Sequence, residues 1–153
     1  MRRDKHNYYL DIAEKVAERS TCLRRRHGAI IVQADEVIAT GYNGAARKTK
    51  NCVDTGVCVR QEMDVPSGER YELCVAVHAE ANAIISAARR DMLGGTLYLV
   101  GMDATSGTVM EDEDACMMCK RLIINAGIAK VVIRRSEKKY IVVDVQEKWV
   151  DKQ

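Results

Sequence analysis

A histidine–glutamate pair and a later cysteine pair are the side chains of this sequence best suited to chemistry. His78 and Glu80 form an H-x-E pattern, and Cys116 and Cys119 form a C-x-x-C pattern. Imidazole and thiolate groups are favoured zinc ligands, and a zinc ion with only three protein ligands keeps one position open for water. The pattern therefore predicts a reaction centre in which the histidine and the two cysteines hold zinc, and Glu80 moves protons beside them.

Each half of the motif also has a simpler interpretation. A single histidine at a helix start is more often structural, and a single C-x-x-C can be a redox pair or half of a structural zinc site. Together the halves match the signature of zinc-dependent nucleobase deaminases, in which the glutamate is not a ligand. A proline usually precedes the first cysteine there, and Ala115 stands in its place. Because that proline only presets the first helical turn, we expect a less rigid but working site.

The elements around these motifs follow from hydrophobic periodicity and turn residues. The expected helices cover residues 7–20, 78–90, 116–126 and 146–150. The expected strands cover residues 28–32, 37–41, 96–100, 128–134 and 140–143, the first two forming a β-hairpin, and a further small hairpin is expected around Ser106 and Gly107. This order predicts one α/β domain over residues 1–153, in which helices pack on a sheet with parallel neighbours across the later crossovers.

Four further cysteines lie in or near a long irregular segment over residues 45–75; they are Cys22, Cys52, Cys58 and Cys74. A loop of this length is uncommon unless something holds it. Disulfides are rare in reducing compartments, so one interpretation is a second, closed zinc site made of thiolates. The other is four unrelated thiols that behave as small apolar side chains. The zinc interpretation is preferred because it explains how the loop is held.

Composition narrows the class of protein. The chain has 153 residues, of which 47% are apolar and 30% charged, with a net charge of +2. These values are typical of one soluble globular domain. So small a net charge predicts no nucleic-acid partner and no attraction to membrane surfaces. The first twenty residues lack the apolar core of a signal peptide, and no stretch is long enough to span a membrane, so we expect a cytoplasmic protein.

From Leu10 to about Trp149 the chain resembles the deoxycytidylate (dCMP) deaminase family. The matching pieces are residues 22–29, 40–45, 68–74, 78–84 and 116–128. The deaminase signature is shared by cytidine, adenosine and guanine deaminases, and Gly41-Tyr42-Asn43-Gly44 points to the nucleotide branch. The resemblance implies a three-layer α/β/α sandwich with a central mixed sheet of about five strands. It also implies hydrolysis of dCMP to dUMP and ammonia, which supplies thymidylate synthesis.

The same resemblance assigns substrate contacts, effectors and assembly. The expected substrate contacts are Asn43, Ala79 and Arg26, with Asn43 on the sugar 3′-hydroxyl. Asn43 could instead only form a turn, and the triplet Arg24–Arg26 could be a solvated face instead of a phosphate site. The second zinc would bridge Cys22 and Cys52. A homo-oligomer is implied, often a hexamer, activated by dCTP and inhibited by dTTP, with Mg2+ accompanying such effectors.

Two other functions stay open at this point. One is deamination of a different nucleobase, such as a tRNA adenosine or a free nucleoside. The other is a non-catalytic protein of the same fold, acting as a binding module in DNA uptake or nucleotide sensing. Glu80 argues against the second, because a purely structural zinc site has no use for a proton carrier.

Overall fold

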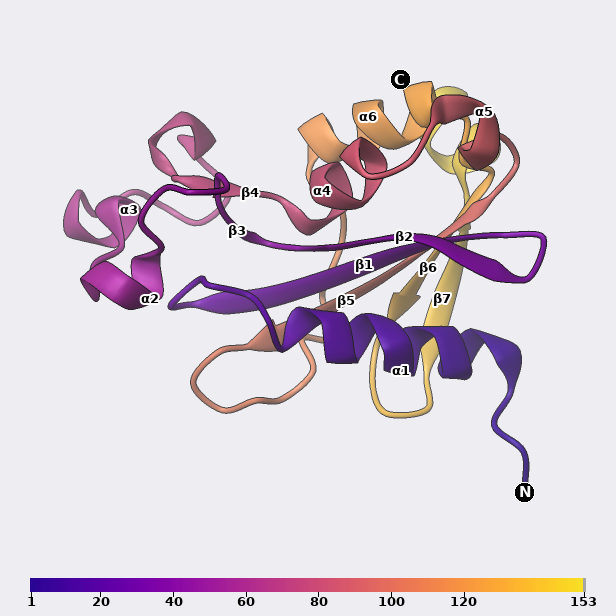
Figure 1. Cartoon of the computed structure of the whole chain (residues 1–153), viewed down its shortest axis with the longest axis horizontal. Helices are drawn as coiled ribbons and strands as arrows, with labels where there is room; N and C mark the ends of the chain where they lie inside the picture. Colours follow the sequence, from indigo (N-terminus) through magenta and orange to yellow (C-terminus); the bar gives the residue numbers. More distant parts are fainter. Residues whose placement is uncertain (153) are drawn as a thin grey trace.

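The computed structural model describes residues 1–152 and places one mixed sheet between two layers of helices (Figure 1). Its strands are β1 (Arg25–Gln33), β2 (Glu36–Tyr42), β5 (Thr96–Asp103), β6 (Lys130–Arg134) and β7 (Tyr140–Asp144). They lie in the order β2-β1-β5-β6-β7. Only β5 and β6 are parallel; the other neighbours are antiparallel. The predicted α/β/α sandwich with a mixed sheet of five strands is confirmed, as is the parallel pair across the last helical crossover.

The remaining elements are short apart from two helices. The helices are α1 (Lys5–Ala17), α2 (Cys52–Thr55), α3 (Val59–Glu62), α4 (Ala79–Ile85), α5 (Arg89–Met92), α6 (Met117–Ala126), a 3-10 turn η1 (Tyr71–Leu73) and a π-helical turn η2 (Gln146–Val150). Strands β3 (Gly44–Ala45) and β4 (Ala76–Val77) pair with each other outside the main sheet. The small hairpin predicted at Ser106–Gly107 forms at the end of β5, where Met102 bridges Val109. No helix within residues 1–152 has the length and apolar content needed to cross a membrane.

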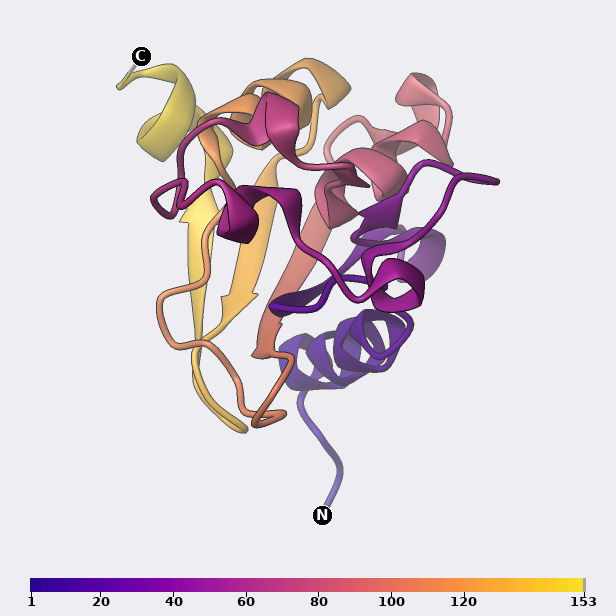
Figure 2. The ribbon, with the colours of Figure 1, turned by 90° about the vertical axis from the view of Figure 1, so that its left-hand side faces the viewer.

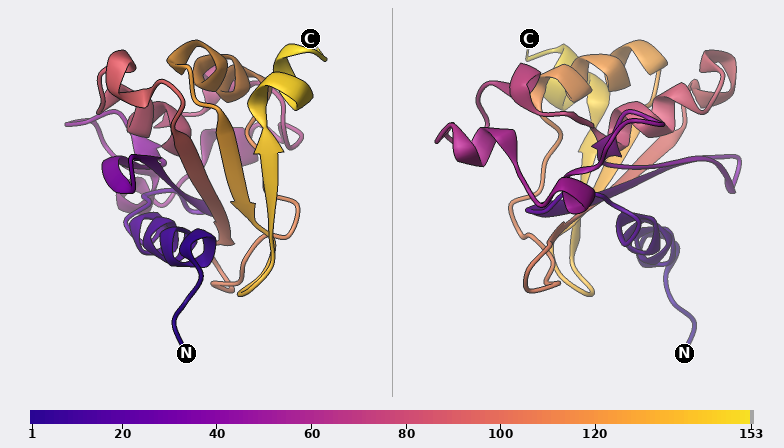
Figure 3. Two further views of the ribbon diagram at one scale, coloured as in Figure 1. Left: turned by 90° about the vertical axis from the view of Figure 1, so that its right-hand side faces the viewer. Right: turned by 60° about the vertical axis from the view of Figure 1, so that its left-hand side comes forward.

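Apolar side chains fill both faces of the sheet. Helix α1 covers one face, and α4, α5, α6 and η2 cover the other (Figure 3). Along β1, Ile30 packs into the core beneath α1, while Ile31 packs into the core beneath α4 and α6. Because both faces are covered, the central strands read as continuous apolar runs, without alternating polar residues.

A glycine in β2 lets helix α4 pack close against the sheet. A Cβ atom on Gly41 would lie 2.3 Å from the carbonyl oxygen of Ala79 and 2.4 Å from the amide nitrogen of Ala83. Helix α4 can therefore rest directly on β2 only because residue 41 has no side chain. Asn82 adds a hydrogen bond from its side-chain amide to the carbonyl oxygen of Tyr42, at 2.8 Å.

The single helix predicted over residues 78–90 is wrong, because the structure divides it into α4 and α5. Ala88 has an extended backbone between them, with φ −78° and ψ 142°. The break lets Met92 reach the core, where it is 2% exposed, and lets the Arg89 guanidinium donate to the carbonyl of Asn125 at 2.7 Å. Tertiary packing here overrides the high helix propensity of an alanine-rich segment.

The segment over residues 45–75 is held partly by its own hydrogen bonds. It lies in front of one end of the sheet (Figure 2) and contains α2, α3 and η1. Arg60 is buried, and its guanidinium donates to the carbonyl oxygens of Glu69 and Pro66 at 3.1 and 3.2 Å. The pairing of β3 with β4 closes the base of the segment. This loop therefore has an internal anchor that the sequence interpretation did not foresee.

Candidate active site

The two halves of the sequence motif meet where two helices begin. His78 is the residue that caps α4, and Cys116 caps α6. Cys119 is one turn into α6 and is 2% exposed. The Nδ1 atom of His78 lies 3.5 Å from Sγ of Cys116 and 3.4 Å from Sγ of Cys119. Within residues 1–152, this is the only group of three or more His, Cys, Asp or Glu side chains whose ligand atoms all lie within 4.8 Å of one another.

These distances fit a zinc ion. At zinc–nitrogen and zinc–sulfur distances of about 2.0–2.1 and 2.3 Å, two ligands of a tetrahedral site lie about 3.6 Å apart. The observed spacings of 3.4 and 3.5 Å match that value without any movement of the backbone. One nitrogen and two sulfur atoms make the set of three protein ligands that leaves a fourth position open.

The cysteine pair is already biased toward a thiolate. The hydrogen bond with Cys119, helped by His78, lowers the pKa of the Cys116 thiol to about 4. The same hydrogen bond, with burial, raises the pKa of Cys119. The hydrogen bond with Cys116 raises the pKa of His78. One negative charge is therefore shared between the two sulfur atoms and faces the histidine, which is a setting that favours a cation.

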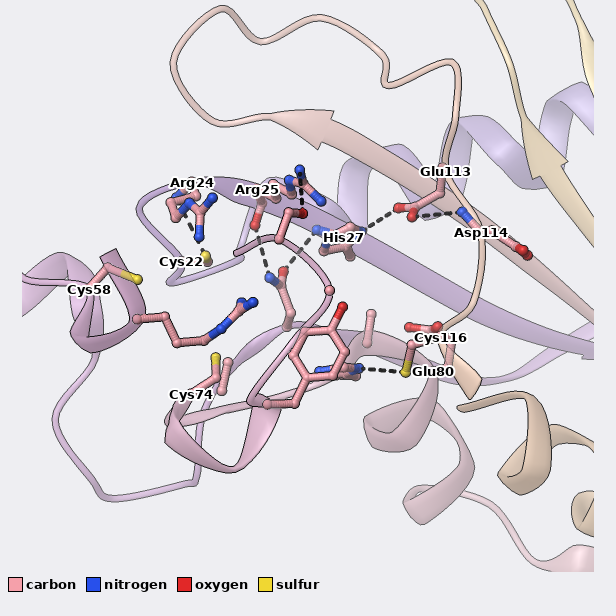
Figure 4. Close-up of a pocket in the computed structure, with 18 residues that line it drawn as sticks. Cys22, Arg24, Arg25, His27, Cys58, Cys74, Glu80, Glu113, Asp114 and Cys116 are labelled. Carbon is pink, nitrogen blue, oxygen red and sulfur yellow. Dashed lines mark hydrogen bonds and ion pairs between the residues drawn. The ribbon is translucent and has the colours of Figure 1, made fainter. Parts of the chain in front are cut away.

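Glu80 faces the same pocket from the first turn of α4. It is 5% exposed, and burial raises the pKa of its carboxyl above the usual range. Figure 4 shows Glu80 and Cys116 together at one end of the pocket. Glu80 is not part of the three-residue ligand cluster. A carboxyl group with a raised pKa beside a metal site is suited to accept a proton and return it.

An aromatic ring forms part of the pocket wall. The ring of Tyr71 meets the ring of His78 edge-on, with 5.1 Å between centroids. The guanidinium of Arg60 lies over the ring of Tyr71, with its central carbon 4.9 Å from the ring centroid. Both residues line the pocket. The sequence did not single out Tyr71 or Arg60, because their positions at the pocket depend on how the segment over residues 45–75 folds back.

Asn43 lines the pocket, but its amide also holds the backbone of β1. Its Oδ1 accepts from the amide of His27 at 2.8 Å, and its Nδ2 donates to the carbonyl of Arg25 at 2.9 Å. It is 6% exposed. The Oδ1 and Nδ2 atoms of Asn43 each keep one further hydrogen-bonding position for a ligand. Ala79, also predicted as a substrate contact, is fully buried and borders the pocket at the start of α4.

The predicted phosphate contact, Arg26, is not among the residues that line the pocket. Arg24 and Arg25 do line it, together with Ser67 and Gly68. Successive side chains of a strand point to opposite faces, so Arg25 and Arg26 cannot both face the pocket. The Arg25 guanidinium donates to the Ser67 hydroxyl at 3.4 Å. Sequence alone could not choose among three adjacent arginines.

The four other cysteines gather in one region without forming a metal-sized cluster. Cys22, Cys58 and Cys74 line the pocket at the end away from Glu80 (Figure 4), and Cys52 lines a neighbouring cavity with Cys58 and Cys74. Burial and the charges of the other three thiols raise the pKa of Cys52. The residues are therefore neighbours, but within residues 1–152 their sulfur atoms do not meet the spacing found at His78 and its partners.

The structure adds a pair of pocket residues that the sequence analysis missed. Nδ1 of His27 on β1 hydrogen-bonds Oε2 of Glu113. Glu113 is 5% exposed and lies on the segment that leads from β5 to α6. Figure 4 shows the two side chains facing each other at the Glu80 end of the pocket. Glu113 stands in the acidic run of residues 111–114, and nothing in its local sequence signals a buried partner.

Comparison with known proteins agrees with this geometry. The family described as "Cytidine and deoxycytidylate deaminase zinc-binding region" matches residues 3–135. The chain belongs to that family.

Individual relatives fit the same class. The deoxycytidylate deaminase of Mycobacterium phage D29 is 38% identical over 136 residues, which cover 86% of this chain and 94% of that protein. The deoxycytidylate deaminase of Schizosaccharomyces pombe is 34% identical over 130 residues, which cover 85% of this chain and 37% of that protein. Among solved structures, the dCMP deaminase of cyanophage S-TIM5 gives a TM-score of 0.60 at 25% identity, with 88% of this chain and 85% of that chain covered.

Proposed function

We propose that this protein hydrolyses dCMP to dUMP and ammonia. The observation that carries the proposal is the meeting of Glu80 with a three-ligand metal cluster in one pocket that Asn43 also lines. Three relatives named deoxycytidylate deaminase, at 34–38% identity, support dCMP as the substrate. The buried, acid–base side chain supports catalysis over a binding role, because a purely structural metal site has no use for it.

The chain's own residues supply binding and proton transfer. Zinc held by His78, Cys116 and Cys119 would lower the pKa of a water molecule to about 7 and so make it a nucleophile. Glu80 would accept a proton from that water as it attacks the amino-bearing ring carbon. The same carboxyl group would then donate to the ring nitrogen and to the leaving ammonia. Because Glu80 is buried, its proton exchanges with the reactants instead of bulk solvent.

Substrate recognition is proposed to come from pocket residues outside the group of candidate zinc ligands, Asn43 and Arg25 in particular. A free hydrogen-bonding position of the Asn43 amide would bind the sugar 3′-hydroxyl, while the amide keeps its two hydrogen bonds to β1. Arg25, beside Ser67, is a better candidate for the phosphate than Arg26, since it lines the pocket. A guanidinium can bind two phosphate oxygens at once. Ala79 would contribute through its backbone, because its side chain is only a methyl group.

A panel of substrates tests the proposal directly. Ammonia release should be measured with dCMP, CMP, deoxycytidine, dCTP and an adenosine-bearing tRNA loop, using zinc-loaded protein. The expected result is highest efficiency with dCMP. Release from the RNA loop alone would replace dCMP with a tRNA substrate, and no release from any compound would favour a non-catalytic binding protein. The Glu80→Gln variant is the control for contaminating deaminases.

Assembly and regulation are proposed from the resemblance. We propose a homo-oligomer, a hexamer in particular, from the resemblance. Exposed apolar side chains on the helical side of the sheet opposite α1 support contact between subunits; they are Ile85, Leu93, Met117, Met118 and Leu122. We propose dCTP as activator and dTTP as inhibitor, with Mg2+ bound only through their phosphates, and a cytoplasmic location. Light scattering with and without each nucleotide, together with turnover, tests the assembly and the effectors. A monomer unaffected by either nucleotide would contradict both.

A second zinc ion among Cys22, Cys52, Cys58 and Cys74 is also proposed. The shared neighbourhood of these thiols supports it, as does the length of the segment that they border. Small movements of side chains would be needed to bring the sulfur atoms to about 3.8 Å from one another, as a tetrahedral thiolate site requires. The zinc content of the purified protein is the test.

A further inference from the structure

The His27–Glu113 pair has a geometry that leaves one atom for a ligand. A carboxylate only accepts hydrogen bonds, so Nδ1 of His27 carries the hydrogen in its bond with Glu113. No protein partner for Nε2 is found within residues 1–152, and His27 lines the pocket with its side chain 23% exposed. A histidine held by a carboxylate through one nitrogen presents the other in a fixed direction.

A glycine on the neighbouring strand makes room for this carboxylate. Register across β1 and β5 pairs His27 with Gly101. A Cβ atom on Gly101 would lie 2.0 Å from Oε2 of Glu113, so the missing side chain is the space that the carboxylate fills. Oε1 of Glu113 accepts from the amide of Asp114 at 3.0 Å, and its carbonyl accepts from the Arg135 guanidinium at 2.6 Å. Glu113 is thus fixed on three sides, and its orientation toward His27 is set.

His27 contacts the proposed sugar-binding residue, and the charges of the proposed reaction centre act on it. Its backbone amide donates to Asn43, the proposed sugar contact, and its ring faces Glu113 (Figure 4). Burial lowers the pKa of the His27 imidazole, but the hydrogen bond and charge of Glu113 outweigh it, and the net pKa is raised. Glu80 also raises this pKa and His78 opposes it, so His27 is electrostatically close to the reacting end. The proposed phosphate contact, Arg25, lies two residues earlier on β1, where its guanidinium donates to Ser67.

We propose that Nε2 of His27 hydrogen-bonds the pyrimidine base of the substrate, and that Glu113 is the positioning residue that holds the imidazole in place. The proposal rests on the proposed function, since the base is that of the nucleotide. It adds a polar contact to the ring, beyond the metal cluster and Glu80. Loss of a contact that is made equally in the ground state and the transition state raises KM and leaves kcat nearly unchanged.

A matched pair of variants tests the contact. In His27→Asn, the side-chain amide can still donate to Glu113 in place of Nδ1, whereas nothing replaces Nε2. The control is His6→Asn, because His6 also hydrogen-bonds through Nδ1, to the Tyr98 hydroxyl at 2.9 Å, far from the pocket lining. We expect His27→Asn to raise the KM for dCMP about 10-fold with kcat within about 3-fold, and His6→Asn to change neither.

A base-free inhibitor separates a contact with the base from damage to the pocket. Deoxyribose 5-phosphate carries the sugar and phosphate only, and its inhibition constant should be the same for wild type and His27→Asn. Parallel weakening of this inhibitor would overturn the base contact, as would an unchanged KM for dCMP. Glu113→Gln should raise KM less than His27→Asn does, because an amide oxygen can still accept from Nδ1; a larger increase would assign the dominant role to Glu113. Failure of wild type to deaminate dCMP would refute the proposed function and not this placement of His27, which dCMP binding measured by calorimetry would then test.

Discussion

Replacing Asn43 by alanine should destabilise the protein as well as impair substrate binding. The Asn43 amide satisfies the amide of His27 and the carbonyl of Arg25 at 2.8 and 2.9 Å. A backbone group left unpaired costs about 1–3 kcal/mol. Because the residue Arg25 is exposed as a whole, we take the lower part of this range, about 1–2 kcal/mol for each group. The expected loss is about 2–4 kcal/mol in the free energy of unfolding, or about 4–16 °C in Tm.

Urea unfolding followed by circular dichroism measures this loss, with the metal content held equal between proteins. Asn125→Ala is the matched control, since Asn125 is exposed on α6 and alanine favours a helix. It should change the free energy of unfolding by less than about 0.5 kcal/mol. If Asn43→Ala is as stable as that control, the two hydrogen bonds do not hold β1 and the geometry derived for the pocket is wrong.

The remaining predictions concern proton transfer, metal content and pH. Glu80→Gln should lower kcat by at least about 100-fold while zinc stays bound; a tenth of wild-type turnover would refute the proton role. Metal analysis should find two zinc ions per chain, with Cys116→Ser losing one together with activity and Cys52→Ser losing the other together with thermal stability. One zinc ion, unaffected by Cys52→Ser, would remove the second site. Asp35 accepts a hydrogen bond from Tyr9 and, with burial, raises the pKa of the Tyr9 phenol to about 12. Since an unfolded tyrosine titrates near pH 10, this contribution to stability is complete below pH 10 and is lost between pH 10 and 12. Tyr9→Phe should flatten that part of the curve of stability against pH, and an unchanged curve would contradict the assignment.

Local patterns in the sequence predicted the elements that local interactions determine. The hairpin predicted over residues 28–41 appears as β1 and β2, and the helix predicted over 116–126 appears as α6. The group of three candidate zinc ligands was predictable because H-x-E and C-x-x-C each place their side chains at a helix start. Two positively polarised helix ends aimed at one point favour thiolates. The spacing of residue types therefore carries this part of the site.

Features set by tertiary register could not be predicted. His27 and Glu113 are 86 positions apart, and they meet only because β1 pairs with β5 opposite a glycine. The break between α4 and α5 depends on where Met92 must reach the core, which helix propensity does not encode. Arg25 and not Arg26 lines the pocket because of the direction in which the side chains of β1 alternate. A one-residue change of register would reverse that outcome.

The most direct test of the central claim is the ratio of kcat/KM for dCMP and deoxycytidine with zinc-loaded wild-type protein. The two substrates share the base and sugar and differ only in the phosphate, so their ratio measures recognition of the nucleotide. Charge-assisted hydrogen bonds from a guanidinium to the phosphate predict a preference for dCMP of at least about 100-fold. The Glu80→Gln variant should release ammonia from either compound at least about 100-fold more slowly. Equal efficiency on the two substrates would contradict the assignment and move this protein to the nucleoside branch of its family.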